Sequence, residues 1–595
     1  MNVIEKAIED FFVYRKFGIF VHWGLYSLLG GVWKGRSTPY IGEWIMRRCR
    51  IPVAEYQTLA AQFNPARFDA DRWIEAVERA GAKYFVFTAK HHDGFAMYHS
   101  KADKYNIIDA SKYPTDPVAA LAKACEKRGI KFCLYYSQDQ DWHHPHGSGN
   151  DWDFDESKKD FSIFFNEKVK PQVTELLTQY GPIGLIWFDT PATITKPHSQ
   201  ELFDLVHRLQ PACLVNGRLG HGMGDYAQTE DNDMPAGATE NAWEIPATMN
   251  DTWGYKRFDT NWKSAQVLIR QLIEAVSKGG NYLLNIGPDA DGAIPAASIE
   301  RLEAIGRWLK THQKAIYGVK PSPFPMEFPW GCVTSNCNRL FLNVLHPNKD
   351  KIELMSLKNK VVGAALLGNH HRPVFYEQSD ANFDGCYKLS LHCPGLSQNT
   401  EPCVIAVEVD GAIQVDKTIV QQPDGKIVLE AHRGLLHAAG GQKLGSHSSI
   451  HGWTTAEGSM EWVFKVHTPG CYEIAILTAA LREDGDPATP IEWEGGHQIC
   501  VTVAGRRIQG CISETFEVAP EGSYARFIGS SIGQIQLPAA GQYTLVLTAD
   551  KVFSNKGLGF TLRSVCLNAV KSSPHTIAAY KRSETAQTRA PEVAV

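Results

Sequence analysis

Short apolar runs that end in polar or aromatic residues recur through the first half of the chain. The clearest is residues 184–190, where large apolar side chains lead into a single carboxylate, Asp189. A run of this length and composition predicts a buried strand that carries Asp189 at its tip. Polar groups gathered at the ends of successive parallel strands are typical of the active-site face of a barrel enzyme. Four other runs share the pattern: residues 19–24, 85–94, 132–137 and 214–218.

Stretches with helical periodicity separate these runs. Glycine or proline ends the first four of them, as Gly129 does before the strand expected at 130–134. This alternation predicts parallel strands joined by crossover helices, and residues 1–320 are long enough for a (β/α)8-type, TIM-like barrel. A doubly wound open sheet is the alternative, but no glycine-rich phosphate loop follows any strand. We expect helices over residues 68–79, 116–128, 160–180, 198–210, 264–278 and 296–315.

The pattern changes after residue 320. Short alternating runs appear between Asn, Asp, Gly and Pro, which is typical of antiparallel strands. Residues 321–415 are therefore expected to form a β-sandwich domain, and residues 425–572 a jelly roll. The polar residues 573–595 are expected to be disordered.

The bulk properties exclude several classes of function. Among 595 residues the net charge is −5 and no basic tract occurs, so neither nucleic acid nor a membrane is an expected partner. No basic segment followed by an apolar core opens the sequence, and no uninterrupted apolar segment could span a bilayer. The 13 cysteines are scattered without Cys-x-x-Cys spacing, which favours reduced thiols. We expect a cytoplasmic protein that has no metal and no other cofactor.

Six segments of the first half combine histidine, tryptophan, tyrosine and carboxylates. They are residues 17–24, 42–44, 90–95, 135–137, 187–189 and 248–255. Together, and in this order, they resemble the retaining α-L-fucosidases of glycoside hydrolase family 29 over residues 10 to 320. The resemblance implies a retaining exo-α-L-fucosidase that removes terminal α-L-fucosyl residues by double displacement through a covalent fucosyl-enzyme. The expected partner is then a fucosylated oligosaccharide or glycoside.

The reaction that the resemblance implies needs two carboxyl groups. In a retaining glycosidase they lie about 5 Å apart across the anomeric carbon. One is an ionised nucleophile, and the other protonates the leaving oxygen and then activates water. The resemblance implies that Asp189 is the nucleophile. A helix-capping or surface aspartate is the other interpretation of Asp189.

Two glutamates compete for the role of acid/base. Arg218 followed by Thr229 and Glu230 resembles the arrangement in one branch of the family, which favours Glu230. Glu244, in a Trp-Glu pair common to these enzymes, is the alternative. The other interpretation of Glu244 is a structural carboxylate bonded to the loop before Trp253.

The resemblance also implies a sugar-binding pocket. A sugar presents C–H faces and a ring of hydroxyls, so planar donors and aromatic rings suit it. A metal site at the histidines is the rival interpretation, but adjacent histidines on an extended segment point to opposite sides. The implied hydrogen-bonding residues are His22, Glu43, His91, His92 and Arg218, and the implied walls are Trp44, Tyr136, Trp187 and Trp253.

Functions of other classes stay open at this point. A non-catalytic fucose- or glycan-binding protein would use the all-β domains, and a barrel hydrolase for a related sugar such as L-galactose would share the pocket. The jelly roll resembles carbohydrate-binding modules appended to glycosidases, where Trp453, Trp462 and Trp493 are either stacking platforms or core aromatics. The long aromatic loop 138–155 is expected to shape the mouth of the pocket. The large uncharged β surfaces favour a homo-oligomer.

Overall fold

The chain divides into two compact units. The first contains the residues up to Asp416, and the second contains Lys417–Ala480, Trp493–Val518 and the described residues from Phe527 onward. The tail 573–595, for which we expect disorder, lies outside the described residues. The computed structural model describes residues 2–39, 41–235, 237–238, 241–346, 349–368, 372–380, 385–445, 448–480, 492–518 and 526–570.

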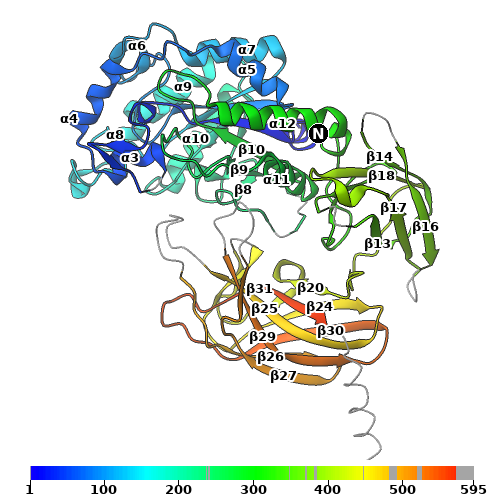
Figure 1. Ribbon diagram of the computed structural model, residues 1–595. Helices are drawn as coiled ribbons and strands as arrows, with labels where there is room; N and C mark the ends of the chain where they lie inside the picture. The colour runs from blue at the N-terminus through cyan, green and yellow to red at the C-terminus, as the bar shows by residue number, and fades with distance from the viewer. Residues whose placement is uncertain are drawn as a thin grey trace, which may run out of the picture. The chain divides into compact units, whose positions relative to one another are not determined.

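Eight parallel strands form one sheet in the first unit (Figure 1). Their order in the sheet is β7-β6-β5-β4-β1-β10-β9-β8. A parallel bridge between Asn216 and Tyr226 joins the residues next to β7 and β8, the two ends of that order. The sheet therefore closes on itself, which confirms the predicted TIM-like barrel and excludes the open sheet. The strands are β1 (Phe17–Val21), β4 (Tyr84–Lys90), β5 (Lys131–Tyr136), β6 (Leu185–Phe188), β7 (Leu214–Val215), β8 (Ala227–Gln228), β9 (Trp243–Thr248) and β10 (Asn281–Ile286).

Six longer helices accompany the barrel strands. They are α5 (Ala70–Arg79), α7 (Pro117–Arg128), α9 (Lys170–Gln179), α10 (Lys196–Leu209), α11 (Ala265–Ser277) and α12 (Ala296–His312). Among the described residues between β7 and β9 there is no α-helix, and the short 3-10 turn Gly217–Leu219 follows β7. The shorter helices are α1 (Val3–Glu9), α2 (Tyr26–Leu29), α3 (Ile45–Arg48), α4 (Val53–Tyr56), α6 (Ile107–Ala110) and α8 (Phe161–Phe164).

Helix α7 illustrates how local sequence sets these boundaries. The side chain of Asp116 accepts a hydrogen bond from the backbone N–H of Ala119, and Pro117 occupies the first helical position. Both features stabilise a helix start, because the first N–H groups have no partner within the helix. Gly129 ends the helix with a φ of 65°, a left-handed conformation that glycine adopts without steric cost. The helix that the sequence predicts thus begins and ends at the expected residues.

Alternate residues of the barrel strands face opposite sides of the sheet. Tyr135 and Trp187 belong to a buried cluster inside the barrel, together with Phe20 of β1. The residues that follow them, Tyr136 and Phe188, pack with the surrounding helices instead. Because side chains alternate along a strand, a shift of one residue exchanges the barrel interior for the outer core. All eight strands are parallel, so their C-terminal ends meet on one face of the barrel.

Antiparallel strands complete the first unit. One sheet has the order β11-β12-β18-β14-β15 and a second has the order β13-β17-β16. The indole N–H of Trp308 in α12 donates to the carbonyl of Pro402 at 2.8 Å, and Phe341 and Val404 join the outer core of the barrel. The strands are β11 (Gly331–Asn336), β12 (Arg339–Val344), β13 (Lys351–Leu357), β14 (Val361–Leu366), β15 (Arg372–Pro373), β16 (Phe375–Asp380), β17 (Tyr387–His392) and β18 (Cys403–Val409), with a separate hairpin of β2 (Val32–Trp33) and β3 (Arg36–Ser37).

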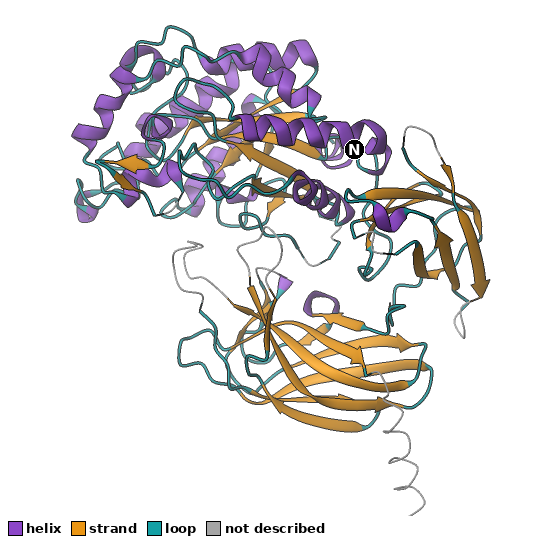
Figure 2. Ribbon diagram, in the orientation of Figure 1, coloured by secondary structure: helices purple, strands orange, loops and turns teal. Residues whose placement is uncertain are grey.

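The second unit is built mainly of strands (Figure 2). A six-stranded and a seven-stranded sheet contribute to one buried core. The strands are β19 (Ile419–Val420), β20 (Ile427–Glu430), β21 (Leu435–His437), β22 (Lys443–Leu444), β23 (Ile450–Trp453), β24 (Ser459–Val466), β25 (Gly470–Ala480), β26 (Gln498–Val503), β27 (Arg506–Cys511), β28 (Phe516–Val518), β29 (Arg526–Leu537), β30 (Gly541–Lys551) and β31 (Phe560–Ala569).

The tryptophans of the second unit are occupied by its own packing. Trp453 and Trp462 are almost fully buried in the core, so they are not surfaces on which a sugar could stack. Trp493 is half-buried, and its indole N–H donates to the hydroxyl of Thr478 at 2.8 Å. The core interpretation of the first two residues is therefore correct.

Two further findings concern the whole described chain. None of its helices combines the length and the apolar composition that crossing a membrane requires. All 13 cysteines are free thiols, as their scattered spacing predicts.

Candidate active site

Asp189 directly follows β6 and lies among several donors. Its Oδ2 accepts a hydrogen bond from the hydroxyl of Tyr135 at 2.8 Å, and its Oδ1 accepts one from Nη1 of Arg218 at 3.1 Å. Nε2 of His92 lies 3.5 Å from Oδ2. Burial would raise the pKa of Asp189, but the guanidinium of Arg218 and the hydroxyl of Tyr135 outweigh burial and hold this pKa below its ordinary value. The carboxylate is therefore ionised, and 12% of its side chain remains exposed to a ligand.

Arg218 joins Asp189 to a second carboxylate. It lies in the short turn Gly217–Leu219 that follows β7. Its Nη1 binds Asp189, and its Nη2 binds Oδ1 of Asp231 at 2.6 Å. Burial opposes the positive charge, but the two carboxylates raise the pKa of Arg218 above its ordinary value. The guanidinium also lies 5.0 Å from the ring centre of Trp187, a distance typical of a cation–π contact.

Three predicted histidines gather at the same face. Nδ1 of His22 hydrogen-bonds Oδ1 of Asn285 at 2.8 Å, and Nδ1 of His92 hydrogen-bonds Oγ of Ser137 at 2.6 Å. Burial lowers the pKa of His22 to about 4 and the pKa of His92 to about 3, so both rings are neutral at neutral pH. Nδ1 of His91 is buried and has no hydrogen-bond partner among the described residues.

The premise that residues 91 and 92 are extended is wrong. The backbone N–H of Gly94 donates to the carbonyl of His91 at 3.1 Å, which closes a turn. As a result the rings of His91 and His92 lie side by side, with their centres 4.2 Å apart. Within the described part of the chain, no group of three or more His, Cys, Asp or Glu residues is arranged to hold a metal ion.

Glu43 and Trp253 lie on the side of His22. Oε2 of Glu43 accepts a hydrogen bond from the backbone N–H of Gly254 at 2.7 Å, which ties Glu43 to the segment that carries Trp253. Burial raises the pKa of Glu43 to about 7, against the effect of this hydrogen bond. The ring of Trp253 lies 5.2 Å from that of His22. Glu43 thus positions one wall of the site, and Trp253 forms it.

Glu244 lies inside the barrel, away from the strand ends that carry Asp189. Its carboxyl accepts hydrogen bonds from the indole N–H of Trp187 at 2.9 Å and from the hydroxyl of Tyr84 at 2.6 Å. Tyr84 begins β4 and Glu244 is the second residue of β9, so this carboxyl lies toward the N-terminal ends of the strands. Burial raises the pKa of Glu244 to about 7, although its donors oppose that shift. The arrangement favours the structural interpretation of Glu244.

Glu230 and Asp231 follow β8 in a loop at the rim. Glu230 is exposed, and its backbone carbonyl accepts a hydrogen bond from the N–H of Asp233 at 3.1 Å. Asp231 is the residue that Arg218 binds, although the sequence interpretation did not include it. Burial and the negative charges of Asp189 and Glu230 raise the pKa of Asp231, while Arg218 opposes that shift. Asp231 is therefore a second carboxyl group close to Asp189, and the exposed Glu230 is its neighbour in the chain.

Tyr135, not Tyr136, faces the site. The hydroxyl of Tyr136 donates to Oε1 of Gln172 in α9 at 2.8 Å, and the residue is fully buried in the outer core. Tyr135 pairs with Trp187 in the β5–β6 register, and their rings stack at 5.8 Å. The sequence placed the tyrosine pair at the correct strand end, but the strand's twofold alternation decided which ring faces inward.

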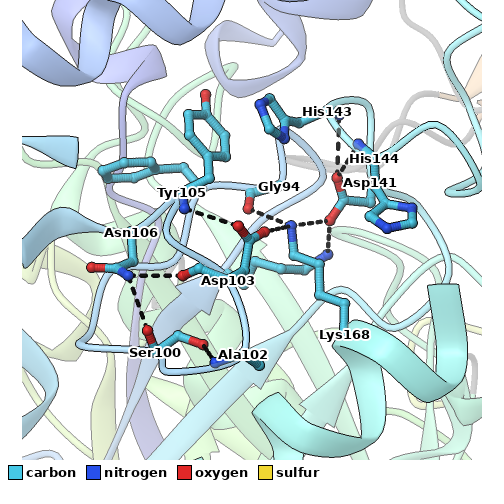
Figure 3. A network of polar contacts seen from close by, with 12 residues as sticks. Gly94, Ser100, Ala102, Asp103, Tyr105, Asn106, Asp141, His143, His144 and Lys168 are labelled. Atoms are coloured by element: carbon cyan, nitrogen blue, oxygen red, sulfur yellow. Dashed lines mark hydrogen bonds and ion pairs between the residues drawn. The ribbon is translucent and has the colours of Figure 1, made fainter. Parts of the chain in front are cut away.

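The loop 138–155 is anchored by buried charges. Nζ of Lys168 lies 2.9 Å from Oδ2 of Asp141 and 2.6 Å from Oδ2 of Asp103 (Figure 3). Nζ of Lys90 reaches Asp141 as well, at 3.0 Å. Burial would raise the pKa of Asp141, but the two lysines outweigh burial and lower it well below its ordinary value. These ion pairs anchor the loop at Asp141.

Trp44 lines the side of the site that this loop borders. Its ring lies 5.4 Å from the ring of His92 and 5.4 Å from that of Trp142. Trp142 is fully buried, and its backbone N–H donates to the carbonyl of His92 at 2.7 Å. The loop thus contacts the site at His92.

The arrangement as a whole suits a hydroxylated ligand and nucleophilic chemistry. It combines an ionised carboxylate, neutral imidazoles, a guanidinium and aromatic rings at the open face of a barrel. Of the predicted residues, His22, Glu43, Trp44, His91, His92, Trp187, Asp189, Arg218, Glu230 and Trp253 lie in or around this site, whereas Tyr136 and Glu244 point elsewhere. Tyr135 and Asp231 were missed, although each directly adjoins a residue that was named.

Comparisons with known proteins agree with this chemistry. A family model described as alpha-L-fucosidase matches residues 2–314. The plasma alpha-L-fucosidase of Rattus norvegicus is 32% identical over 67% of this chain and 90% of its own length. The tissue alpha-L-fucosidase of Mus musculus is 33% identical over 53% of this chain and 73% of its own.

Solved structures extend the similarity beyond the barrel. The alpha-L-fucosidase from Vibrio sp. strain EJY3 matches 95% of this chain and 98% of its own, with 31% identity and a TM-score of 0.82. The unliganded alpha-L-fucosidase AlfC from Lactobacillus casei is 42% identical over 52% of this chain and 99% of its own, with a TM-score of 0.50. Since the family model covers more than half of the residues, the chain belongs to the α-L-fucosidase family of glycoside hydrolases.

Proposed function

We propose that the chain is a retaining exo-α-L-fucosidase in which Asp189 is the nucleophile. The observation that carries this proposal is the surroundings of Asp189. Arg218 and Tyr135 bind its two different oxygens and keep it ionised at the C-terminal face of the barrel. An anionic carboxylate that stays partly exposed is what attack on an anomeric carbon requires.

The proposed reaction has two displacements. In the first, a carboxylate oxygen of Asp189 attacks the anomeric carbon, the bond to the aglycone oxygen breaks, and a carboxylic acid gives its proton to that oxygen. In the second, the same acid, now a carboxylate, takes a proton from water, whose oxygen attacks the anomeric carbon and releases Asp189. The sugar leaves with its original anomeric configuration.

We place the acid/base on the loop that follows β8. Glu230, the predicted residue, lies there and is exposed, as a group that meets an aglycone and water must be. Its neighbour Asp231 is a second candidate, because it shares Arg218 with Asp189 and its pKa is raised by burial and by nearby negative charge. A raised pKa favours the protonated form that the first displacement needs. Glu244 is disfavoured, since both its oxygens are engaged inside the barrel.

Hydrolysis of 4-nitrophenyl α-L-fucoside, beside other nitrophenyl glycosides including the α-L-galactoside, tests the substrate. An AlfC variant has been solved in complex with this fucoside, which makes the compound a suitable probe. We expect turnover of the fucoside and formation of α-L-fucose as the first product. Equal turnover of the galactoside would assign the pocket to both sugars, and a β-configured first product would contradict the retaining mechanism.

Azide rescue assigns the acid/base. Glu230→Ala, Asp231→Ala and Glu244→Ala are compared with and without sodium azide, because azide can attack the fucosyl-enzyme without help from a base. Loss of activity that azide restores, with formation of α-fucosyl azide, identifies the acid/base residue. We expect rescue at Glu230 or Asp231. Rescue at Glu244 alone would overturn the placement on the β8 loop.

A further inference from the structure

Gln138 links the backbones of the two residues that form the central ion pair. Its Oε1 accepts a hydrogen bond from the backbone N–H of Asp189 at 2.8 Å, and its Nε2 donates to the backbone carbonyl of Arg218 at 3.0 Å. The residue is fully buried directly after Ser137. Both ends of the amide are thus used, one on the strand end of β6 and the other on the turn after β7. Only a side chain with one acceptor and one donor can make this bridge.

Asp139 holds the backbone that follows Asp189. Its Oδ2 accepts three consecutive backbone N–H groups, from Ala192, Thr193 and Ile194, at 2.8, 2.6 and 2.6 Å. Its Oδ1 accepts a hydrogen bond from the hydroxyl of Thr193 at 2.9 Å. Asp139 is also fully buried. A buried carboxylate that receives this many donors is satisfied and rigid, and so is the segment that supplies them.

The residue between the nucleophile and this segment has a strained backbone. Thr190 has a φ of 47°, in the left-handed region that a β-branched residue rarely adopts. Such a conformation persists only where neighbouring contacts impose it. The contacts on either side are those of Gln138 to residue 189 and of Asp139 to residues 192–194.

We propose that Gln138 and Asp139 are positioning residues, which hold the backbone around Asp189 so that its carboxylate stays aligned with Arg218 and with the substrate. The proposal rests on the proposed role of Asp189. Neither side chain touches the carboxylate itself, so each acts through the backbone. Misplacement of a reacting group by about 1 Å can lower an enzymatic rate about 100-fold, which is why such support matters.

The first test is Gln138→Met, which keeps the length of the side chain and removes both hydrogen bonds. Gln172→Met is the matched control, because Gln172 is equally buried and hydrogen-bonds Tyr136 and Ser100 outside the site. We expect kcat/KM for 4-nitrophenyl fucoside to fall about 10- to 100-fold in Gln138→Met and to stay within about threefold of wild type in Gln172→Met. Tm values of both variants show whether a loss reflects unfolding.

The pH profile separates positioning from a merely structural role. Asp189 faces Arg218, His92 and Tyr135, with Asp231 across the guanidinium. If Gln138→Met loosens the Asp189–Arg218 pair, the acidic limb of kcat/KM must move to higher pH, because the carboxylate loses part of its stabilisation. An unmoved limb, or equal losses of rate in both glutamine variants, would overturn the role of Gln138.

Asp139 is tested with Thr190 in a double-mutant cycle. Both carboxylate oxygens of Asp139 accept hydrogen bonds, whereas the asparagine amide has only one acceptor oxygen. We therefore expect Asp139→Asn to lower kcat/KM about tenfold. Glycine adopts a positive φ without strain, so in Thr190→Gly the turn needs less support from Asp139. Asp139→Asn should therefore lower kcat/KM less in the Thr190→Gly background than in wild type. Strictly additive effects would show that Asp139 does not support this turn.

Asp189→Asn is measured beside these variants. If Asp189→Asn retains turnover, the proposed nucleophile itself is wrong. If Asp189→Asn is inactive while Gln138→Met and Asp139→Asn behave as wild type, only the positioning inference fails.

Discussion

The open face of the barrel and the core of the second unit both bury tryptophan, but with different partners. In the barrel, the indole N–H of Trp187 donates to the carboxyl of Glu244, and the ring lies under the guanidinium of Arg218. In the second unit, the indole N–H of Trp462 donates to the backbone carbonyl of Glu430, and the ring packs among apolar side chains. The residue type is the same, and only its neighbours distinguish a site from a core.

The two regions differ in the free-energy cost of what they bury. Burying an ionisable group costs free energy unless hydrogen bonds or opposite charges compensate. At the open face of the barrel, burial raises the pKa of Glu43 and lowers the pKa values of His22 and His92. Concentrated shifts of this kind are typical of functional sites. The core around Trp462 consists of apolar side chains and stabilises the fold instead.

The largest expected effect is a loss of catalytic activity without a loss of thermal stability. Asp189→Asn keeps the shape of the side chain but removes the charge of the proposed nucleophile, so kcat/KM should fall at least about 10⁴-fold. The Tm should change little, because Arg218 keeps its contact with Asp231. Steady-state kinetics with nitrophenyl fucoside and thermal unfolding of the same sample check both statements. Turnover near the wild-type rate would remove Asp189 from the mechanism.

Trp462→Ala should have the opposite effect, with lower stability and almost unchanged activity. The residue is about 1% exposed in the core of the second unit, so truncation leaves a cavity and should lower the free energy of unfolding by about 3–5 kcal/mol. Hydrolysis of the small fucoside at 25 °C should stay within about twofold of wild type. Urea unfolding and kinetics on one preparation test the contrast. A large loss of activity from the folded variant would show that the second unit contributes to catalysis.

Glu244→Gln should change the pH dependence of stability. The pKa of Glu244 is raised to about 7 in the folded chain, so the folded state keeps a proton that the unfolded state releases above its ordinary pKa. Protonated Glu244 therefore contributes its full share to the free energy of unfolding below about pH 4.5. This contribution is lost as the pH rises through about 7. Relative to wild type, the variant should therefore gain up to about 3 kcal/mol across this range.

Urea unfolding of wild type and Glu244→Gln at several pH values measures that gain. Glu78→Gln provides the control, because Glu78 is a surface residue whose carboxylate pairs with Arg128. A constant difference between wild type and Glu244→Gln at all pH values would show that Glu244 has the same protonation in both states.

The smallest expected effect compares two neighbours on β5. Tyr135→Phe removes a hydrogen bond to the Asp189 carboxylate, and a bond to a charged group is typically worth about 1.5–3 kcal/mol. We therefore expect kcat/KM to fall about 10- to 100-fold. Tyr136→Phe, which loses only a bond to Gln172, should stay within about threefold of wild type. The reverse order of effects would mean that the inward and outward sides of β5 are interchanged.

The barrel and the place of its site could be predicted from local pattern. Strand–helix alternation and capping residues such as Asp116 and Gly129 act within a few positions, so they are visible in the sequence. The polar residues at the strand ends marked the C-terminal face of the barrel, and Asp189 lies there as predicted. The same pattern could not distinguish Tyr135 from Tyr136, because both are aromatic and a strand turns alternate residues to opposite sides.

Tertiary structure decided the surroundings of the carboxyl groups. In the sequence, Glu230, Asp231 and Glu244 are three acidic residues near one another. In the fold, Glu244 is enclosed by side chains from β4 and β6, whereas Asp231 meets an arginine from the turn after β7. A carboxyl's protonation depends on burial and on charges within a few ångströms, and here those come from residues far apart in the chain. Sequence therefore located Asp189 at the barrel face, and long-range packing determined how the charges around it are arranged.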